Sequence, residues 1–106
     1  MKIVIFGGTS EGRRLSHELA AAGAEVTVSV ASEYGAEEQG REDGITIERG
    51  AKEEDEICAM IREADLVIDA THPYAVLVTE HIQRAAETTG VERMRLLREK
   101  RLRMSA

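Results

Sequence analysis

The pattern that most constrains the fold lies at the N-terminus, where four apolar residues, Ile3 to Phe6, run into Gly7-Gly8 and then into a helix-forming segment. A short apolar run bounded by glycine is typical of a central strand in a parallel sheet that is covered on both faces. Glycine permits positive φ angles and lets a ligand approach the main chain without meeting a Cβ atom. The pattern therefore predicts a strand, a tight turn and a helix whose free N–H groups and positive dipole end face the turn.

This turn is a candidate phosphate site, because helix N-termini that follow glycine turns bind anions. Its candidate residues are Gly7, Gly8, Thr9, Ser10 and Gly12, with Thr9 and Ser10 supplying hydroxyl groups and N-cap candidates. The spacing Gly-Gly-x-x-x-Gly is a relaxed form of the dinucleotide fingerprint, and it lacks the Gly-Lys-Ser/Thr ending of a P-loop. Taken alone, the turn is either a nucleotide site or only a tight connection, since glycine also serves chain reversal and helix packing.

Apolar periodicity places the other elements along the chain. Further strands are predicted at 25–30, 45–48, 65–70 and 93–98, and helices between 10 and 22, between 53 and 64 and between 73 and 89. Leu15, Leu19 and Ala22 are expected to form the buried stripe of the first helix. Pro73 is expected at the first position of the last helix, with Thr71 or His72 as its cap. The prediction is a single-domain α/β fold that is Rossmann-like, with a mostly parallel sheet of about five strands and helices on both faces.

Length and composition exclude several classes of protein. The 106 residues suit one domain, and no apolar run approaches the roughly 20 residues of a membrane span, so no membrane partner is expected. No secretory signal pattern precedes the first strand. The single cysteine, Cys58, excludes an internal disulfide framework and a cysteine metal site, so no metal is expected and the cytoplasm is the predicted location.

Charge is unevenly distributed along the chain. Residues 1–92 carry 8 Lys and Arg against 19 Asp and Glu, whereas residues 93–106 carry 6 against 1. An acidic body argues against a nucleic-acid protein, which needs an extended basic face. The basic end is either a binding segment for an anion or RNA, or a charged edge strand followed by a frayed terminus.

Candidate site residues lie where predicted strands end, since ligands of open α/β sheets bind at the carboxyl ends of the strands. The turns at 7–12, 31–35 and 69–74 are therefore expected to line one crevice. At the tip of the second strand, Ser29 and Ser32 offer hydroxyls while Glu33 lies beyond the usual carboxylate position. This pattern favours NADP(H) over NAD(H), although no arginine clamp is evident in the tip. Tyr34 either covers the adenine or is an exposed loop aromatic.

Histidine offers one further candidate for chemistry. His72 follows the fourth strand, and its expected role is to donate a proton, to orient a substrate carboxylate or to cap the next helix. His17 and His81 fall on predicted helices and are expected at the surface.

Three segments together resemble the precorrin-6A reductase family of cobalamin biosynthesis: residues 5–13, 29–35 and 68–75, the last reading Ile-Asp-Ala-Thr-His-Pro-Tyr-Ala. The resemblance extends to about Glu99. It implies an NADPH-dependent oxidoreductase that transfers hydride to a double bond of the corrin precursor, converting precorrin-6A or cobalt-precorrin-6A to the 6B product. It also implies phosphate contacts at the glycine turn and 2′-phosphate contacts near Ser29 and Ser32. A wall on the nicotinamide side or the substrate side would then be formed by Thr71, His72, Pro73 and Tyr74. Thr71 is also counted among the cofactor contacts. His72 and Tyr74 are the catalytic candidates.

Members of the resembled family are about twice this long and have a second α/β domain that closes over the tetrapyrrole. We therefore expect residues 1–99 to form the NADP(H)-binding domain and residues 100–106 a basic tail at the junction to a second domain or chain. On this reading the chain alone is expected to bind nucleotide, but turnover is not expected to follow from binding. The alternative is a stand-alone NADP(H)-binding or sensing module without catalytic activity, which would form a homodimer through an exposed edge.

Overall fold

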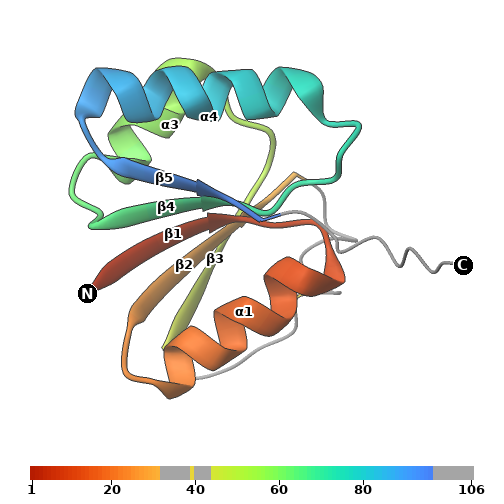
Figure 1. Cartoon of the computed structure of the whole chain (residues 1–106), viewed down its shortest axis with the longest axis vertical. Helices are drawn as coiled ribbons and strands as arrows, with labels where there is room; N and C mark the ends of the chain where they lie inside the picture. Colours follow the sequence, from red (N-terminus) through yellow and green to blue (C-terminus); the bar gives the residue numbers. More distant parts are fainter. Residues whose placement is uncertain (32–38, 40–43, 97–106) are drawn as a thin grey trace, which may run out of the picture.

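The computed structural model describes residues 1–31, 39 and 44–96, which are built around a five-stranded sheet (Figure 1). The strands are β1 (Lys2–Phe6), β2 (Glu25–Val30), β3 (Ile45–Arg49), β4 (Leu66–Asp69) and β5 (Glu92–Arg95). Their order is β3-β2-β1-β4-β5, and every neighbouring pair is parallel. All five carboxyl ends therefore lie along one edge, and the winding direction reverses between β1 and β4. The predicted Rossmann-like fold is confirmed.

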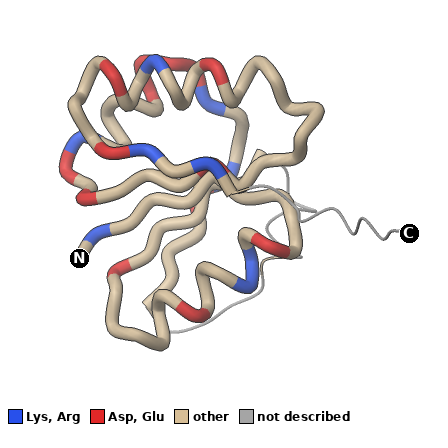
Figure 2. Tube along the Cα trace, viewed as in Figure 1, with Lys and Arg blue, Asp and Glu red and all other residues tan. Residues whose placement is uncertain are grey.

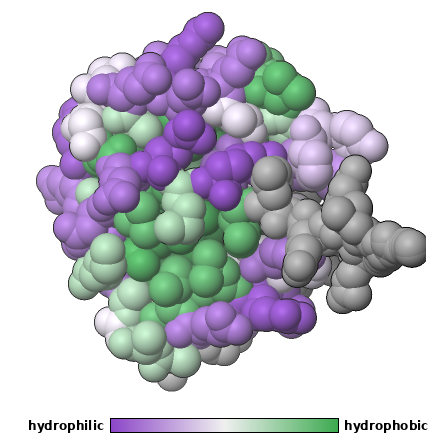
Figure 3. Space-filling view, in the orientation of Figure 1, coloured by the Kyte–Doolittle hydropathy of each residue, from purple (hydrophilic) through white to green (hydrophobic). Residues whose placement is uncertain are grey.

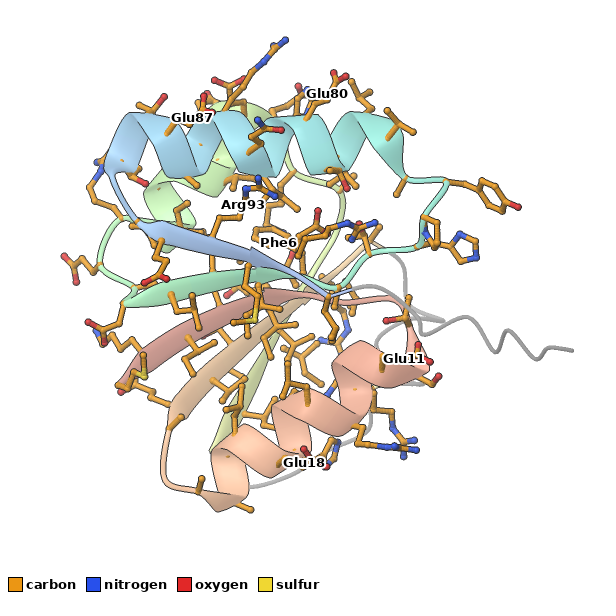
Figure 4. The ribbon with its side chains drawn as sticks, in the orientation of Figure 1. Phe6, Glu11, Glu18, Glu80, Glu87 and Arg93 are labelled. Carbon is orange, nitrogen blue, oxygen red and sulfur yellow. The ribbon has the colours of Figure 1, made fainter. Side chains whose placement is uncertain are left out.

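Helices cover both faces of the sheet (Figure 1). Helix α1 (Ser10–Ala21) lies on one face, and α3 (Glu54–Ile61) and α4 (Val76–Thr89) lie on the other. Alternate residues of β1 reach the two layers: Ile3 and Ile5 join the core beneath α1, while Val4 and Phe6 join the core beneath α3 and α4. Figure 4 shows Phe6 between the sheet and this second layer, whereas Glu80 and Glu87 point outward from α4. The unbroken apolar run from Ile3 to Phe6 in β1 is thus explained by burial on both faces.

Strand register creates a row of residues at the carboxyl edge, on the face below α3 and α4. Phe6 pairs with Ser29 of β2 on one side and with Asp69 of β4 on the other. Asp69 in turn pairs with Arg95 of β5. Two polar residues therefore flank Phe6, and Arg95 follows beyond Asp69, at the edge where ligands of such sheets bind.

The predicted buried stripe of α1 is wrong at Ala22. Leu15 and Leu19 pack against the core as expected, but α1 ends at Ala21, and Ala22 is an exposed C-cap residue. The chain then turns at Gly23, whose φ angle of +100° suits glycine at the end of a helix.

Gly12 and Ser16 form the buried face of α1 instead. A Cβ atom on Gly12 would lie 2.7 Å from the Cβ of Ala70, which real contacts do not allow. Helix α1 therefore approaches the end of β4 more closely than any larger residue would permit.

The predicted start of the last helix is also wrong. Helix α4 begins at Val76 after an Ala75 N-cap that has no side-chain cap, so neither Thr71 nor His72 caps it and Pro73 is not its first residue. Instead the N–H of Ala75 donates to the carbonyl of His72 at 2.9 Å, which closes a turn with Pro73 at its second position. Proline favours that position because its fixed φ angle matches the turn.

The remaining elements agree with prediction within the described ranges. Ile57 and Ile61 of α3 are fully buried, Cys58 is a buried free cysteine, and α4 ends at Gly90 in a left-handed conformation. Strand β5 is an edge strand. Some predictions concern positions outside the described residues. They are those for Ser32, Glu33 and Tyr34, for the rest of 35–43 apart from Gln39, and for 97–106.

Charges of both signs lie on both helix layers, over α1 as well as over α3 and α4 (Figure 2). An apolar area lies between α1 and the β5 edge (Figure 3), where Met94 is 48% exposed beside partly buried Leu66 and Leu96. No helix within the described ranges is long and apolar enough to cross a membrane.

Candidate functional site

A cavity of about 580 Å³ opens at the carboxyl edge of the sheet, close to the point where the winding direction reverses. Its size falls within the range of small-molecule sites. Its lining comes from four parts of the chain. These are residues 6–8, 29–31 and 50–53, and a last part made of residues 71, 72, 74–78 and 81. As far as the described residues extend, the turns after β1, β2 and β4 therefore border one crevice, as the strand-end rule predicts. The loop after β3 joins them.

The glycine turn presents bare main chain to this cavity. Gly8 lines the cavity at a φ angle of +123°, and a Cβ atom built on it would have no neighbour within 4 Å. The N–H groups of Gly8 and Thr9 donate to no described residue. The N–H of Gly7 is already used, because it donates to the Ser29 carbonyl at 2.8 Å. The turn is therefore open to the cavity, and the first main-chain N–H group without a partner among the described residues is that of Gly8.

Thr9 and Gly12 support the turn rather than line the cavity. The Thr9 hydroxyl donates to the Ala70 carbonyl at 2.8 Å and accepts from the Gly12 N–H at 3.1 Å. It thereby caps α1 and ties the helix to the end of β4. The exposed Ser10 hydroxyl donates to a carboxylate oxygen of Glu11 at 3.3 Å. Of the five predicted phosphate residues, Gly7 and Gly8 line the cavity.

Ser29 is the described polar residue at the tip of β2. The residue is only 5% exposed and belongs to the cavity wall. The hydroxyl makes no hydrogen bond with the described residues. A buried hydroxyl without a partner costs free energy, so it indicates a place where a polar ligand atom would be stabilised.

Asp69 at the end of β4 is fully buried and is the centre of a hydrogen-bond network that sequence analysis missed. One carboxylate oxygen accepts from the N–H and the hydroxyl of Thr71, at 3.0 and 2.6 Å, and from the Arg95 guanidinium at 3.0 Å. The other oxygen accepts from the Thr79 hydroxyl at 2.8 Å. The Thr71 hydroxyl, predicted to contact cofactor and substrate, is thus engaged within the protein.

Arg95 also donates to the main-chain carbonyls of Asp69 and Thr71, both at 3.1 Å. It therefore fixes the backbone that leads from β4 into the cavity wall. The sequence signal for this network was an acidic residue ending an apolar strand, but its partner lies 26 positions away and only strand register brings the two together.

His72 and Tyr74 form the outer part of the wall. Their rings stack at a centroid distance of 4.9 Å, and the Tyr74 N–H donates to His72 Nδ1 at 3.3 Å. With Nδ1 as acceptor, the neutral imidazole carries its proton on Nε2. Tyr74 is 87% exposed, so the pair presents an aromatic surface to solvent and to the cavity mouth. Pro73 shapes the turn between them but does not line the cavity.

Two basic residues of the wall, Lys52 and His81, were not predicted as site residues. Lys52 lies in the loop between β3 and α3, and applying the strand-end rule to the third strand would have found it. His81 was expected at the surface of its helix, but it is half-buried and lines the cavity. Its spacing of three residues from Val78, on the same helix face, was the available signal. The described residues contain no cluster of three His, Cys, Asp or Glu side chains that could hold a metal ion.

Comparison with known proteins agrees with this architecture. The family model for precorrin-6x reductase CbiJ/CobK matches residues 2–105. The chain is 38% identical over 91 residues to cobalt-precorrin-6A reductase of Salmonella typhimurium, and 33% identical over 96 residues to the protein of that name from Methanothermobacter thermautotrophicus. These alignments cover 84% and 85% of this chain but 34% and 31% of the relatives, so the chain spans about a third of the curated relatives it matches.

The fold is similar to a solved structure of CobK precorrin-6A reductase, with a TM-score of 0.80 and 27% sequence identity. That match covers 93% of this chain and 39% of the other. Sequence and fold thus agree over nearly the whole chain, which belongs to the precorrin-6x reductase CbiJ/CobK family.

Proposed function

We propose that this chain binds NADPH at the carboxyl edge of its sheet and forms the nucleotide-binding part of a precorrin-6A reductase. The reaction would convert precorrin-6A or cobalt-precorrin-6A to precorrin-6B or its cobalt form in cobalamin biosynthesis. Family membership supports this reaction class, since both curated relatives are cobalt-precorrin-6A reductases. The observation that carries nucleotide binding is the bare main chain at Gly8, which borders the cavity with nothing in the place of a side chain.

The glycine turn fits the pyrophosphate of a dinucleotide. Helix α1 begins at Ser10, so its unpaired N–H groups and the positive end of its dipole lie beside Gly8. Phosphate oxygens approach such a turn closely only when no Cβ intervenes. We assign Gly7, Gly8, Thr9, Ser10 and Gly12 to this part of the site, the first two as its lining and the others as its support.

The two sides of the cavity suit the two ends of the cofactor. Ser29, together with Ser32, is assigned to the adenosine side, because the end of β2 meets the ribose in dinucleotide folds. Thr71, His72, Pro73 and Tyr74 are assigned to the wall that faces nicotinamide or substrate. Bound NADPH would supply the hydride for reduction of a double bond.

Within that wall we assign the proton-donating role to the exposed aromatic pair. His72 holds a proton at Nε2 when neutral, and Tyr74 holds one on its phenol, so either is a candidate to protonate the reduced carbon framework. The stacked rings also offer a flat apolar surface that suits a tetrapyrrole.

The complete reaction would require the parts of the family that this chain does not align with. The curated relatives are about three times as long as the aligned region, and we propose that the equivalent of their remaining sequence, on this or another chain, closes over the tetrapyrrole. We place the reaction in the cytoplasm, where a buried free cysteine such as Cys58 stays reduced.

The test is a fluorescence titration of NADPH into the purified chain and its Gly8→Val variant. Valine should abolish binding, because its side chain would occupy the space beside the turn, while circular dichroism should show a folded protein. Gly23→Val is the matched control, since Gly23 also has positive φ and open space around its Cβ position, but lies at the other end of α1.

Loss of binding in both variants would point to backbone strain alone, and unchanged affinity in Gly8→Val would refute the assignment. If NADPH binds, reduction of precorrin-6A should be assayed with this chain alone and with the remaining part of a full-length relative added. Turnover only in the second case would support the proposed division of the enzyme.

A further inference from the structure

Among the described residues that line the cavity, Lys52 is the lysine, and the proposed phosphate site at the glycine turn gives it no role. Lys52 is half-buried in the loop between β3 and α3, and its ammonium donates to the carbonyls of Arg49 and Gly50 at 3.2 and 3.0 Å. No carboxylate of residues 1–31, 39 or 44–96 lies within salt-bridge distance of it. An ammonium has three N–H donors, so one remains for a ligand.

The loop that carries Lys52 lies beside the tip of β2. Val30 and Arg49 are register partners, and the Gly50 N–H donates to the Val30 carbonyl at 2.9 Å. Lys52 and Ser29 consequently line the same cavity from neighbouring strand ends. In dinucleotide folds this position meets the adenosine ribose.

Ser29 supplies an independent indication of a ligand. The residue is 95% buried and lines the cavity, and its hydroxyl has no hydrogen-bond partner among the described residues. A hydroxyl in this setting gains most from a ligand oxygen that accepts its proton. An ammonium and a hydroxyl at the ribose end of the cavity together suit an anionic oxygen group.

We propose that Lys52 and Ser29 form a subsite for the 2′-phosphate of the adenosine ribose and that Lys52 determines the preference for NADPH over NADH. The specificity contact then comes from the loop after β3, rather than from an arginine at the tip of β2. The two carbonyl contacts hold the ammonium in place before the ligand arrives, which lowers the entropy cost of binding. This inference rests on the proposed NADPH site.

Glu53 lines the same wall and is exposed, so its charge opposes a bound phosphate. The subsite therefore depends on the lysine charge rather than on a generally positive surface. Neutralising Glu53 should strengthen NADPH binding, whereas neutralising Lys52 should weaken it.

The experiment measures the dissociation constants of NADPH and NADH for the full chain and its Lys52→Met variant. Methionine keeps the length of the side chain and removes its charge. Since a hydrogen bond to a charged group contributes about 1.5–3 kcal/mol, NADPH affinity should fall about tenfold to a hundredfold while NADH affinity changes little. Lys52→Arg should restore NADPH affinity, and Ser29→Ala should weaken NADPH selectively by a smaller factor.

Lys2→Met is the matched control, because Lys2 is a surface lysine at the opposite end of β1 that pairs with Glu63. It should leave both affinities unchanged. Equal loss of NADPH and NADH in Lys52→Met, or no loss, would overturn the 2′-phosphate subsite and leave the proposed function intact. If the unmodified chain binds neither coenzyme, the proposed function itself fails.

Discussion

Removing the carboxylate of Asp69 should strongly destabilise the end of β4, which leads into the cavity wall. Asp69 is fully buried and accepts four hydrogen bonds, from the Thr71 N–H and hydroxyl, the Thr79 hydroxyl and Arg95. In Asp69→Ala these donors lose their acceptor in a region that water reaches poorly. Breaking a buried ion pair by removing one partner costs about 3–5 kcal/mol.

The lower end of that range applies here. The Arg95 side chain is 21% exposed and keeps its bonds to two main-chain carbonyls, so part of its charge remains solvated or bonded. We expect a loss of about 3 kcal/mol from a total stability on the order of 5–15 kcal/mol, which leaves a folded protein. For a domain of this size, the melting temperature should fall by roughly 12–24 °C.

The assay is urea unfolding followed by circular dichroism, with Asp69→Asn and Arg95→Met as companions. Asparagine retains one acceptor oxygen and should cost about 1–2 kcal/mol. Arg95→Met should also cost less than Asp69→Ala, because three hydrogen bonds to the carboxylate remain. A loss below about 1 kcal/mol in Asp69→Ala would refute the idea that this network holds the end of β4 in place.

Substitutions at Gly12 and at Thr9 test the junction between α1 and the end of β4. Gly12→Ala should cost about 1–3 kcal/mol through overpacking against the Ala70 Cβ, and the double variant Gly12→Ala/Ala70→Gly should recover part of that loss in the same unfolding assay. If Ala70→Gly recovers no stability in the Gly12→Ala background, the close contact with Ala70 is not the reason that position 12 requires glycine. Thr9→Ala should cost about 1 kcal/mol through loss of the helix cap, whereas Thr9→Ser should stay near the parent protein; equal losses would show that the hydroxyl is not responsible.

Local patterns were sufficient to predict most of the fold. The apolar run before Gly7 has the composition of a strand buried on both faces, and β1 is central in the sheet. The strand-end rule also placed the turns after β1 and β4 on one cavity. These features depend on neighbouring residues and on general winding rules, which is why one sequence suffices to predict them.

Features that depend on strand register or on the exact conformation of a loop could not be predicted in the same way. The pairing of Asp69 with Arg95 follows from the register of β4 and β5, which no local signal gives. Pro73 fits both the start of a helix and the second position of a turn, and only the hydrogen bond between Ala75 and His72 distinguishes them. The contribution of Lys52 depends on its side chain folding back onto its own loop.

The close approach of Gly12 to Ala70 has a consequence for the proposed nucleotide site. The Thr9 hydroxyl joins the start of α1 to the Ala70 carbonyl directly after β4, and the missing side chain at Gly12 lets the same two segments come close together. The position of the start of α1 against the end of β4 is thereby set by contacts within the protein. If the proposed function is correct, the turn would be preorganised for the dinucleotide, and little binding free energy would be spent on ordering it.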